Sequence, residues 1–215
     1  MASHETLTAA IRAIGSGQSD LVASMLHDAP ALAVMHIDPR DEFFVPWCHA
    51  QVYEGDTLLH AAAFAYEAGL CRLVIALGAD VRARNRRGAQ PLHAAAIGAP
   101  GSSNWDPPRQ VETIAFLIDA GADPNAKASG GATPLHRAVR NRCSAAVDAL
   151  LRFGADPYQP NDNGSTAFDL ARWTTGRSGS GSAEAKAEQA IITTMLGKLI
   201  EPLRPQSPYD ARPQP

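Results

Sequence analysis

A nine-residue sequence stretch occurs four times, with changes, along the chain. The copies are GDTLLHAAA at 55–63, GAQPLHAAA at 88–96, GATPLHRAV at 131–139 and GSTAFDLAR at 164–172. Successive copies begin 33, 43 and 33 residues apart. A Gly-Ala-Asp triplet follows each of the first three copies, at 78–80, 121–123 and 154–156. Repetition with a period of about 20 to 50 residues is typical of arrays of stacked units, so we expect one here.

The middle unit is longer than its two neighbours. From the third residue of each copy (Thr57, Gln90 and Thr133) to its Gly-Ala-Asp triplet the distance is 21 residues in two units and 31 in the middle one. Proline and glycine are typical of loops, and the stretch APGSSNWDPP at 99–108 is rich in both. We therefore predict a loop insertion at 99–108.

Apolar residues between these markers recur at helical spacing. In the unit 131–163 the pattern predicts a short helix at 134–141 and a second helix at 145–153. Val147, Leu150 and Leu151 supply the apolar side of the second helix. Each unit is thus predicted to be a helix, a tight turn, a second helix and an exposed hairpin-like loop.

These units resemble the ankyrin repeat. The resemblance rests on TPLHRAV at 133–139 together with DALLRFGADPY at 148–158. It implies an all-α ankyrin-repeat solenoid of about five helix-turn-helix repeats with hairpin-like loops. The expected organisation is a degenerate N-terminal capping repeat at 4–36, a long aromatic inter-repeat loop at 37–54, repeats at 55–87, 88–130 and 131–163, a degenerate C-terminal capping repeat with a Gly/Ser linker at 164–200, and a proline-rich disordered tail at 201–215.

The opening motif of each unit has a structural explanation. Thr133 stands where a helix N-cap is needed, Pro134 suits the first helical position, and Gly131 suits a turn with positive φ. We expect His136 to bridge, through its two ring nitrogens, the cap and the loop of the adjoining unit. The resemblance implies the same structural role for His60 and His93, whereas the last unit has Asp169 at this position and its bridge must differ. The structural motif residues are Thr57, His60, His93, Thr133 and His136.

We expect no catalytic site, no metal and no cofactor. Histidines one repeat apart are separated by roughly 10 Å, whereas zinc needs each nitrogen at about 2 Å. A competing enzyme hypothesis places Cys48 or His49 of the segment 37–54, or the insertion 99–108, in a reactive cleft. Three cysteines are too few for a disulfide framework, and the apolar runs are too short to span a membrane. We therefore expect a cytoplasmic monomer.

The resemblance implies that the concave face, made of first helices and loop tips, grips another protein. The aromatic residues of 37–54 either seal the first repeat or form an apolar contact for a partner. The arginines of 82–87 are either a solvated tip or a site for an acidic partner. Trp105 in the insertion is either exposed for binding or packed on the helices. The partner-binding candidates are Phe43, Phe44, Trp47, Tyr53, Phe64, Arg84, Arg86, Arg87, Trp105, Arg140 and Asn141.

The sequence therefore predicts a non-enzymatic protein–protein interaction module that regulates, scaffolds or inhibits a partner. One alternative is binding of nucleic acid or an acidic ligand through 82–87, although the net charge of −3 argues against nucleic acid. Another alternative is a host-directed bacterial effector, since the family also occurs in bacterial proteins secreted into hosts.

Overall fold

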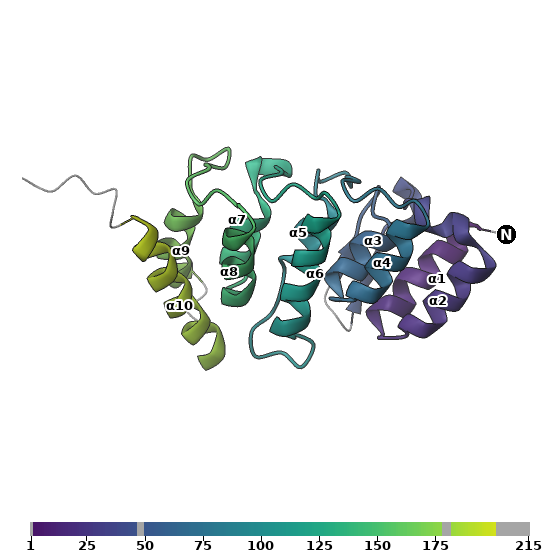
Figure 1. Cartoon of the computed structure of the whole chain (residues 1–215), viewed down its shortest axis with the longest axis horizontal. Helices are drawn as coiled ribbons and strands as arrows, with labels where there is room; N and C mark the ends of the chain where they lie inside the picture. The colour runs from purple at the N-terminus through teal and green to yellow at the C-terminus, as the bar shows by residue number, and fades with distance from the viewer. Residues whose placement is uncertain (1, 47–49, 178–181, 201–215) are drawn as a thin grey trace, which may run out of the picture.

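Helices follow one another in pairs along the chain in the computed structural model, which describes residues 2–46, 50–177 and 182–200 (Figure 1). The first helices of the pairs are α1 (His4–Gly15), α3 (Leu58–Phe64), α5 (Pro91–Ala95), α7 (Pro134–Arg140) and α9 (Ala167–Arg177). The second helices are α2 (Ser19–Asp28), α4 (Ala68–Ala76), α6 (Pro107–Asp119), α8 (Ser144–Arg152) and α10 (Ala183–Ile200). Trp47, Cys48, His49 and the tail 201–215 lie outside the described residues.

The pairs stack in the order of the sequence. Each first helix contacts the first helix of the next unit, from α1 through α9, and the second helices make the same succession of contacts. The motif leucines Leu59, Leu92 and Leu135 are at most 1% exposed, and burying each one stabilises the stack by about 1.5 to 3 kcal/mol. The predicted all-α solenoid is confirmed.

The hairpin-like loops project from one side of the stack, at the top of Figure 1. Their tips are joined by backbone hydrogen bonds: the N–H of Arg86 donates to the carbonyl of Glu54 at 2.8 Å, and that of Ser129 to the carbonyl of Arg87 at 2.8 Å. The N–H of Asp162 continues the series to the carbonyl of Gly130 at 3.0 Å. The loops therefore form a connected edge.

The segment 37–54 contains strands that the sequence analysis did not predict. The 3₁₀ helices η1 (Pro30–Val34) and η2 (Pro39–Asp41) precede an antiparallel pair, β1 (Phe43–Val45) and β2 (Ala50–Val52). Phe43 pairs with Val52 and Val45 with Ala50. Strands of three residues are too short for an alternating pattern to be recognised, so this part of the loop prediction is corrected.

The insertion in the middle unit ends earlier than predicted. Helix α6 begins at Pro107, and the side chain of Asp106 caps it by accepting from the N–H of Arg109 at 3.1 Å. Proline is well suited to the first turn of a helix, so Pro107 and Pro108 belong to α6 and not to the loop. Helix α6 has 13 residues where α4 and α8 have 9, so part of the extra length is helical.

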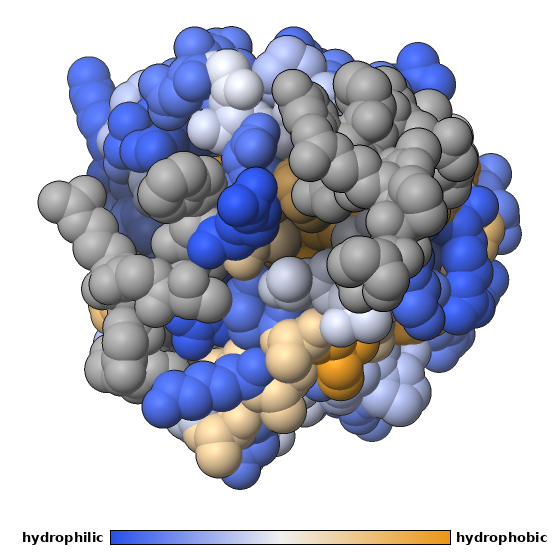
Figure 2. All heavy atoms as spheres, turned by 90° about the vertical axis from the view of Figure 1, so that its left-hand side faces the viewer, coloured by the Kyte–Doolittle hydropathy of each residue, from blue (hydrophilic) through white to orange (hydrophobic). Residues whose placement is uncertain are grey.

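The last helix closes the stack. Ile192 and Leu196 of α10 are at most 1% exposed and pack toward the preceding helices, whereas Ile191 is 48% exposed on the opposite side. Figure 2 looks onto this end, where hydrophilic and apolar surface lie side by side. Among the helices of the described residues, none combines the length and the apolarity needed to cross a bilayer.

Candidate functional site

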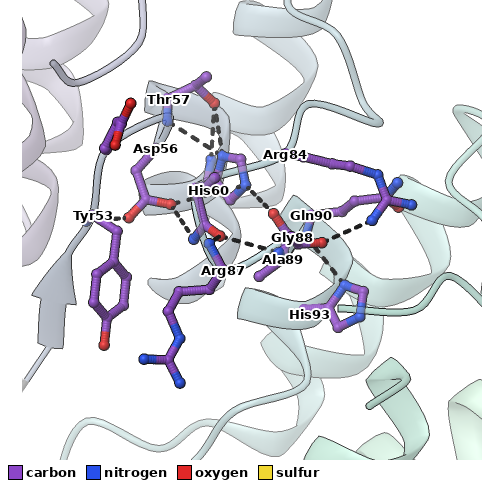
Figure 3. A network of polar contacts seen from close by, with 12 residues as sticks. Tyr53, Asp56, Thr57, His60, Arg84, Arg87, Gly88, Ala89, Gln90 and His93 are labelled. Atoms are coloured by element: carbon purple, nitrogen blue, oxygen red, sulfur yellow. Dashed lines mark hydrogen bonds and ion pairs between the residues drawn. The ribbon is translucent and has the colours of Figure 1, made fainter. Parts of the chain in front are cut away.

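A buried histidine connects each of three successive units to the next. His60 accepts a hydrogen bond at Nδ1 from the N–H of Thr57, at 3.3 Å, and its Nε2 lies 3.0 Å from the carbonyl oxygen of Ala89 (Figure 3). A carbonyl oxygen can only accept, so Nε2 carries the proton and Nδ1 is the acceptor. The imidazole thus satisfies the start of its own helix and the loop of the following unit.

The same geometry recurs in the next two units. The partners are the Gln90 N–H (3.2 Å) and Ala132 carbonyl (3.1 Å) for His93, and the Thr133 N–H (3.3 Å) and Ser165 carbonyl (3.0 Å) for His136. The hydroxyl of Thr133 also accepts from the N–H of His136 at 3.4 Å, which completes a capping box. Gln90 replaces threonine in the middle unit, and its Oε1 is buried without a hydrogen-bond partner among the described residues.

The last unit has Asp169 where the others have histidine. Its carboxylate accepts from the N–H of Thr166 at 2.9 Å and from the hydroxyl at 2.7 Å, and these hydrogen bonds lower its pKa. A carboxylate has no proton to donate to a further unit. The residue therefore caps α9 and suits the end of the array.

Burial determines the charge state of the three histidines. It lowers the pKa of His60, His93 and His136, because a charged imidazolium loses its hydration in the core. For His93, which is fully buried, the pKa falls to about 3. All three side chains are therefore neutral hydrogen-bonding groups in the folded protein at neutral pH.

We expect stability to fall as the pH decreases from 7 to 5. An unfolded histidine, with a pKa of about 6.5, binds a proton that folded His93 does not bind until about pH 3. The stabilisation is complete above pH 6.5, and His93 alone should lose about 2 kcal/mol of it by pH 5. Urea unfolding at both pH values measures this loss.

The variant His93→Gln should lose about 2 kcal/mol less than the wild type between pH 7 and pH 5. His27→Gln is the matched control, because His27 is exposed in α2. An equal loss of stability in the wild type and in His93→Gln would show that folding does not lower the pKa of His93.

The arginines of the loop 82–87 are largely engaged by the chain itself. Arg82 donates to the carbonyl of Gly121 at 2.8 Å, and Arg84 donates to the carbonyls of Gly88 at 2.9 Å and Lys127 at 2.8 Å. Arg86 forms an ion pair with Glu42. The side chains remain exposed, but three of the four guanidinium groups hold neighbouring loops together.

The aromatic candidates are divided between packed and exposed positions. Phe43 is half-buried, with the guanidinium of Arg12 4.1 Å from its ring centroid, while Phe44 is 47% exposed. Tyr53 is half-buried and carries the guanidinium of Arg86 at 5.0 Å from its ring. Trp47 lies outside the described residues. Of the other aromatic candidates in this segment, Phe44 is the most exposed.

Trp105 lies against the stack. Its Nε1 donates to Oε1 of Gln110 at 3.0 Å, and a Cβ atom on Gly98 would lie 2.6 Å from its Cδ1. Gln110 is fully buried and donates to the carbonyl of Ala95 at 2.9 Å, so it fixes the end of α5. Gln110 was not among the predicted site residues, although it shares the buried face of α6 with Ile114 and Leu117 at helical spacing.

One side of the first helices is not covered by the neighbouring units. In α7, Leu135 and Val139 are at most 1% exposed, whereas Arg137 is half-buried and Arg140 is exposed. The equivalent positions of three units are all at least partly exposed, and we call them together the first-helix face. It consists of Ala61, Phe64 and Ala65 from the α3 unit, Ala94, Ile97 and Gly98 from the α5 unit, and Arg137, Arg140 and Asn141 from the α7 unit.

A separate ionisable cluster joins α1 to η2. Nε2 of His4 lies 3.2 Å from a carboxylate oxygen of Asp38, and its Nδ1 lies 3.7 Å from Asp41. Ligand atoms of the three residues lie within 4.8 Å of one another, and all three residues are half-buried. Because each ring nitrogen faces a carboxylate, we interpret the cluster as a contact that packs η2 against α1.

Comparison with known proteins agrees with this architecture. The family model described as "Ankyrin repeat" matches residues 54–86 and 87–129, and that described as "Ankyrin repeats (many copies)" matches residues 117–171. A search of curated proteins found no match. Repeats of this kind are generally protein–protein interaction modules and generally non-enzymatic. Since the matches together span more than half of the chain and include the whole first-helix face, the chain belongs to the ankyrin repeat family.

Proposed function

We propose that this protein is a non-enzymatic interaction module that binds another protein through the first-helix face and the adjoining loop tips. Docking there would regulate, scaffold or inhibit the partner. The observation that carries the proposal is the row of partly exposed positions on three stacked first helices whose other sides are buried. A stack of this kind offers an extended surface, which suits a protein better than a small molecule.

The chemistry of the face supports this proposal. Phe64 and Ile97 offer apolar contact, and Arg140 and Asn141 offer polar contact, within one row of first helices. Aromatic and arginine side chains are the types that dominate binding energy at protein interfaces. Phe44 at the β1–β2 hairpin is the candidate for a peripheral contact.

Nucleic-acid binding through 82–87 is the weaker alternative. Arg82, Arg84 and Arg86 already hydrogen-bond to the chain, and the protein has a net charge of −3. Binding of nucleic acid requires several cations that are free to contact phosphates. The free, buried thiols of Cys71 and Cys143 support action in a reducing compartment, and we propose a cytoplasmic monomer.

We expect the double variant Phe64→Ala, Arg140→Ala to bind the partner at least about tenfold more weakly, because each side chain is placed to contribute more than about 1 kcal/mol. Affinity capture from a lysate of the source organism identifies the partner, and titration with the purified partner gives the dissociation constant. The matched control is Arg152→Ala with Phe153→Ala, one arginine and one aromatic at the end of α8. If the control loses affinity and the first-helix variant keeps it, the proposed face is wrong.

A further inference from the structure

Arg137 occupies an unusual position on the first-helix face. It directly follows His136 in α7, and its side chain is half-buried. No hydrogen bond or ion pair involves its guanidinium within the part of the chain that the structure describes. Burial is the main cause that lowers its pKa, and the nearby charge of Arg87 acts in the same direction. A desolvated guanidinium without an anion is costly to the fold.

The positive charge of Arg137 acts on the two preceding units. It lowers the pKa of His93 in α5 and also that of His60 in α3. Helix α5 lies between α3 and α7, and it presents only the small side chain of Ala94 at the position equivalent to Arg137. Arg137 therefore has no long side chain beside it at the equivalent position of α5.

The charges of two further arginines, Arg87 and Arg140, both act on Arg137. Arg87 comes from the loop tip, where its guanidinium lies 5.6 Å from the ring of Tyr53 and points the same way as that side chain (Figure 3). Arg140 is one helical turn after Arg137 and is exposed. Arg137 and Arg140 thus share one side of α7, and we call these two residues together with Arg87 the cationic cluster.

The nearest carboxylate does not neutralise this cluster. The charge of Asp56 favours the charged form of Arg137. The carboxylate of Asp56 accepts from the N–H of Tyr53 at 2.7 Å (Figure 3). It also accepts from Nδ2 of Asn85 at 2.8 Å. Its two oxygens therefore hold the loop that precedes α3. The cluster has no carboxylate within hydrogen-bonding distance among the described residues.

We propose that the cluster of Arg87, Arg137 and Arg140 binds a carboxylate of the partner, supplied by an aspartate or glutamate side chain. Guanidinium groups match the planar geometry of a carboxylate and bind it with two parallel hydrogen bonds. Phe64 and Ile97 lie on the same face, so an acidic residue flanked by an apolar one fits the surface. This inference rests on the proposed function and names the chemistry of the partner at that face.

A carboxylate fits the cluster better than the phosphates of a nucleic acid do. A nucleic acid presents a row of phosphates and needs an extended basic stripe. The arginines that would extend the cluster along the loop, Arg82 and Arg84, donate to carbonyl groups of the chain. The cluster is therefore limited to three arginines, of which Arg137 is half-buried, and this suits one acidic side chain better than a row of phosphates.

The test uses the full chain and a matched pair of small probes. N-acetyl-aspartate N′-methylamide carries the proposed side chain, and the asparagine counterpart has the same shape without the charge. Arginine Nε–Hε resonances are followed by NMR during titration with each probe. We expect saturable shifts of the resonances of Arg87, Arg137 and Arg140 with the aspartate probe, and none with the asparagine probe.

Substitution completes the test. Arg137→Gln should lower the affinity for the aspartate probe by about tenfold, because charge-assisted hydrogen bonds are lost. Arg87→Gln, at an exposed loop position, should also lower the affinity for the aspartate probe. This variant replaces Arg137→Gln in the test if Arg137→Gln does not fold. Arg152→Gln on α8 should bind like the wild type. Absence of saturable shifts, or binding unchanged in Arg87→Gln and in folded Arg137→Gln, overturns the proposal.

Two further outcomes separate the possible explanations. If inorganic phosphate or a ten-nucleotide single-stranded DNA binds these arginines more tightly than the aspartate probe, the site is a phosphate site and the carboxylate assignment is wrong. Failure of the aspartate probe leaves the proposed binding face untouched, because that face is tested separately by Phe64→Ala with Arg140→Ala.

Discussion

Replacing His93 with alanine is expected to lower the free energy of unfolding by about 3 kcal/mol. The imidazole is fully buried, accepts from the N–H of Gln90 and donates to the carbonyl of Ala132. Its removal leaves both backbone groups without their partner and opens a cavity between two units. Urea unfolding at pH 7.5, followed by circular dichroism, measures the difference.

The control for this substitution is His27→Ala, at an exposed position of α2, which should change the free energy of unfolding by no more than about 0.5 kcal/mol. The pH of 7.5 keeps protonation of the unfolded chain from contributing. A loss below about 1 kcal/mol in His93→Ala would show that the histidine bridge contributes little to the stacking of the units.

Replacing Gly131 with alanine is expected to cost about 3 kcal/mol or more. Gly131 has a φ of +67°, which L-residues adopt only with strain, and an added Cβ atom would lie 2.6 Å from the backbone nitrogen of Asp162. That nitrogen is held by a hydrogen bond to the carbonyl of Gly130 at 3.0 Å, so it cannot move aside without breaking the contact between loop tips.

Gly164 provides the matched comparison, because it occupies the same place in the next unit. Its φ is +76°, and no described atom lies within 4 Å of an added Cβ, so Gly164→Ala should cost only the backbone strain of about 1 kcal/mol. The free energies of unfolding from urea titrations should differ between the two variants by about 2 kcal/mol. Equal losses would show that the loop tips are not closely packed at Gly131.

Much of the fold follows directly from the sequence because the signals are local and repeated. Thr133, Pro134 and His136 stand at fixed offsets from one helix start, and the capping hydrogen bonds between Thr133 and His136 depend on that spacing alone. The short β1–β2 pair and the start of α6 at Pro107 could not be derived, because three-residue strands and a Pro-Pro helix start resemble a loop in the sequence.

The candidate site was harder to predict because long side chains find distant partners. Arg82 reaches Gly121 and Arg86 reaches Glu42, contacts between residues about 40 positions apart that only the stacking of units creates. Arg137 had a usable signal that was missed: the equivalent positions in the preceding units are Ala61 and Ala94. A charged residue where other copies have alanine marks a place at which one unit departs from its structural pattern.

Hydrogen–deuterium exchange, measured for the protein alone and bound to its captured partner, shows whether the first-helix face is the binding surface. We predict slower exchange on binding at residues 61–66, 94–98 and 137–142 and at the loop tips 84–88 and 127–131, with α4, α6 and α8 unchanged. Slower exchange confined to α4, α6 and α8 would show that the partner binds the second helices instead.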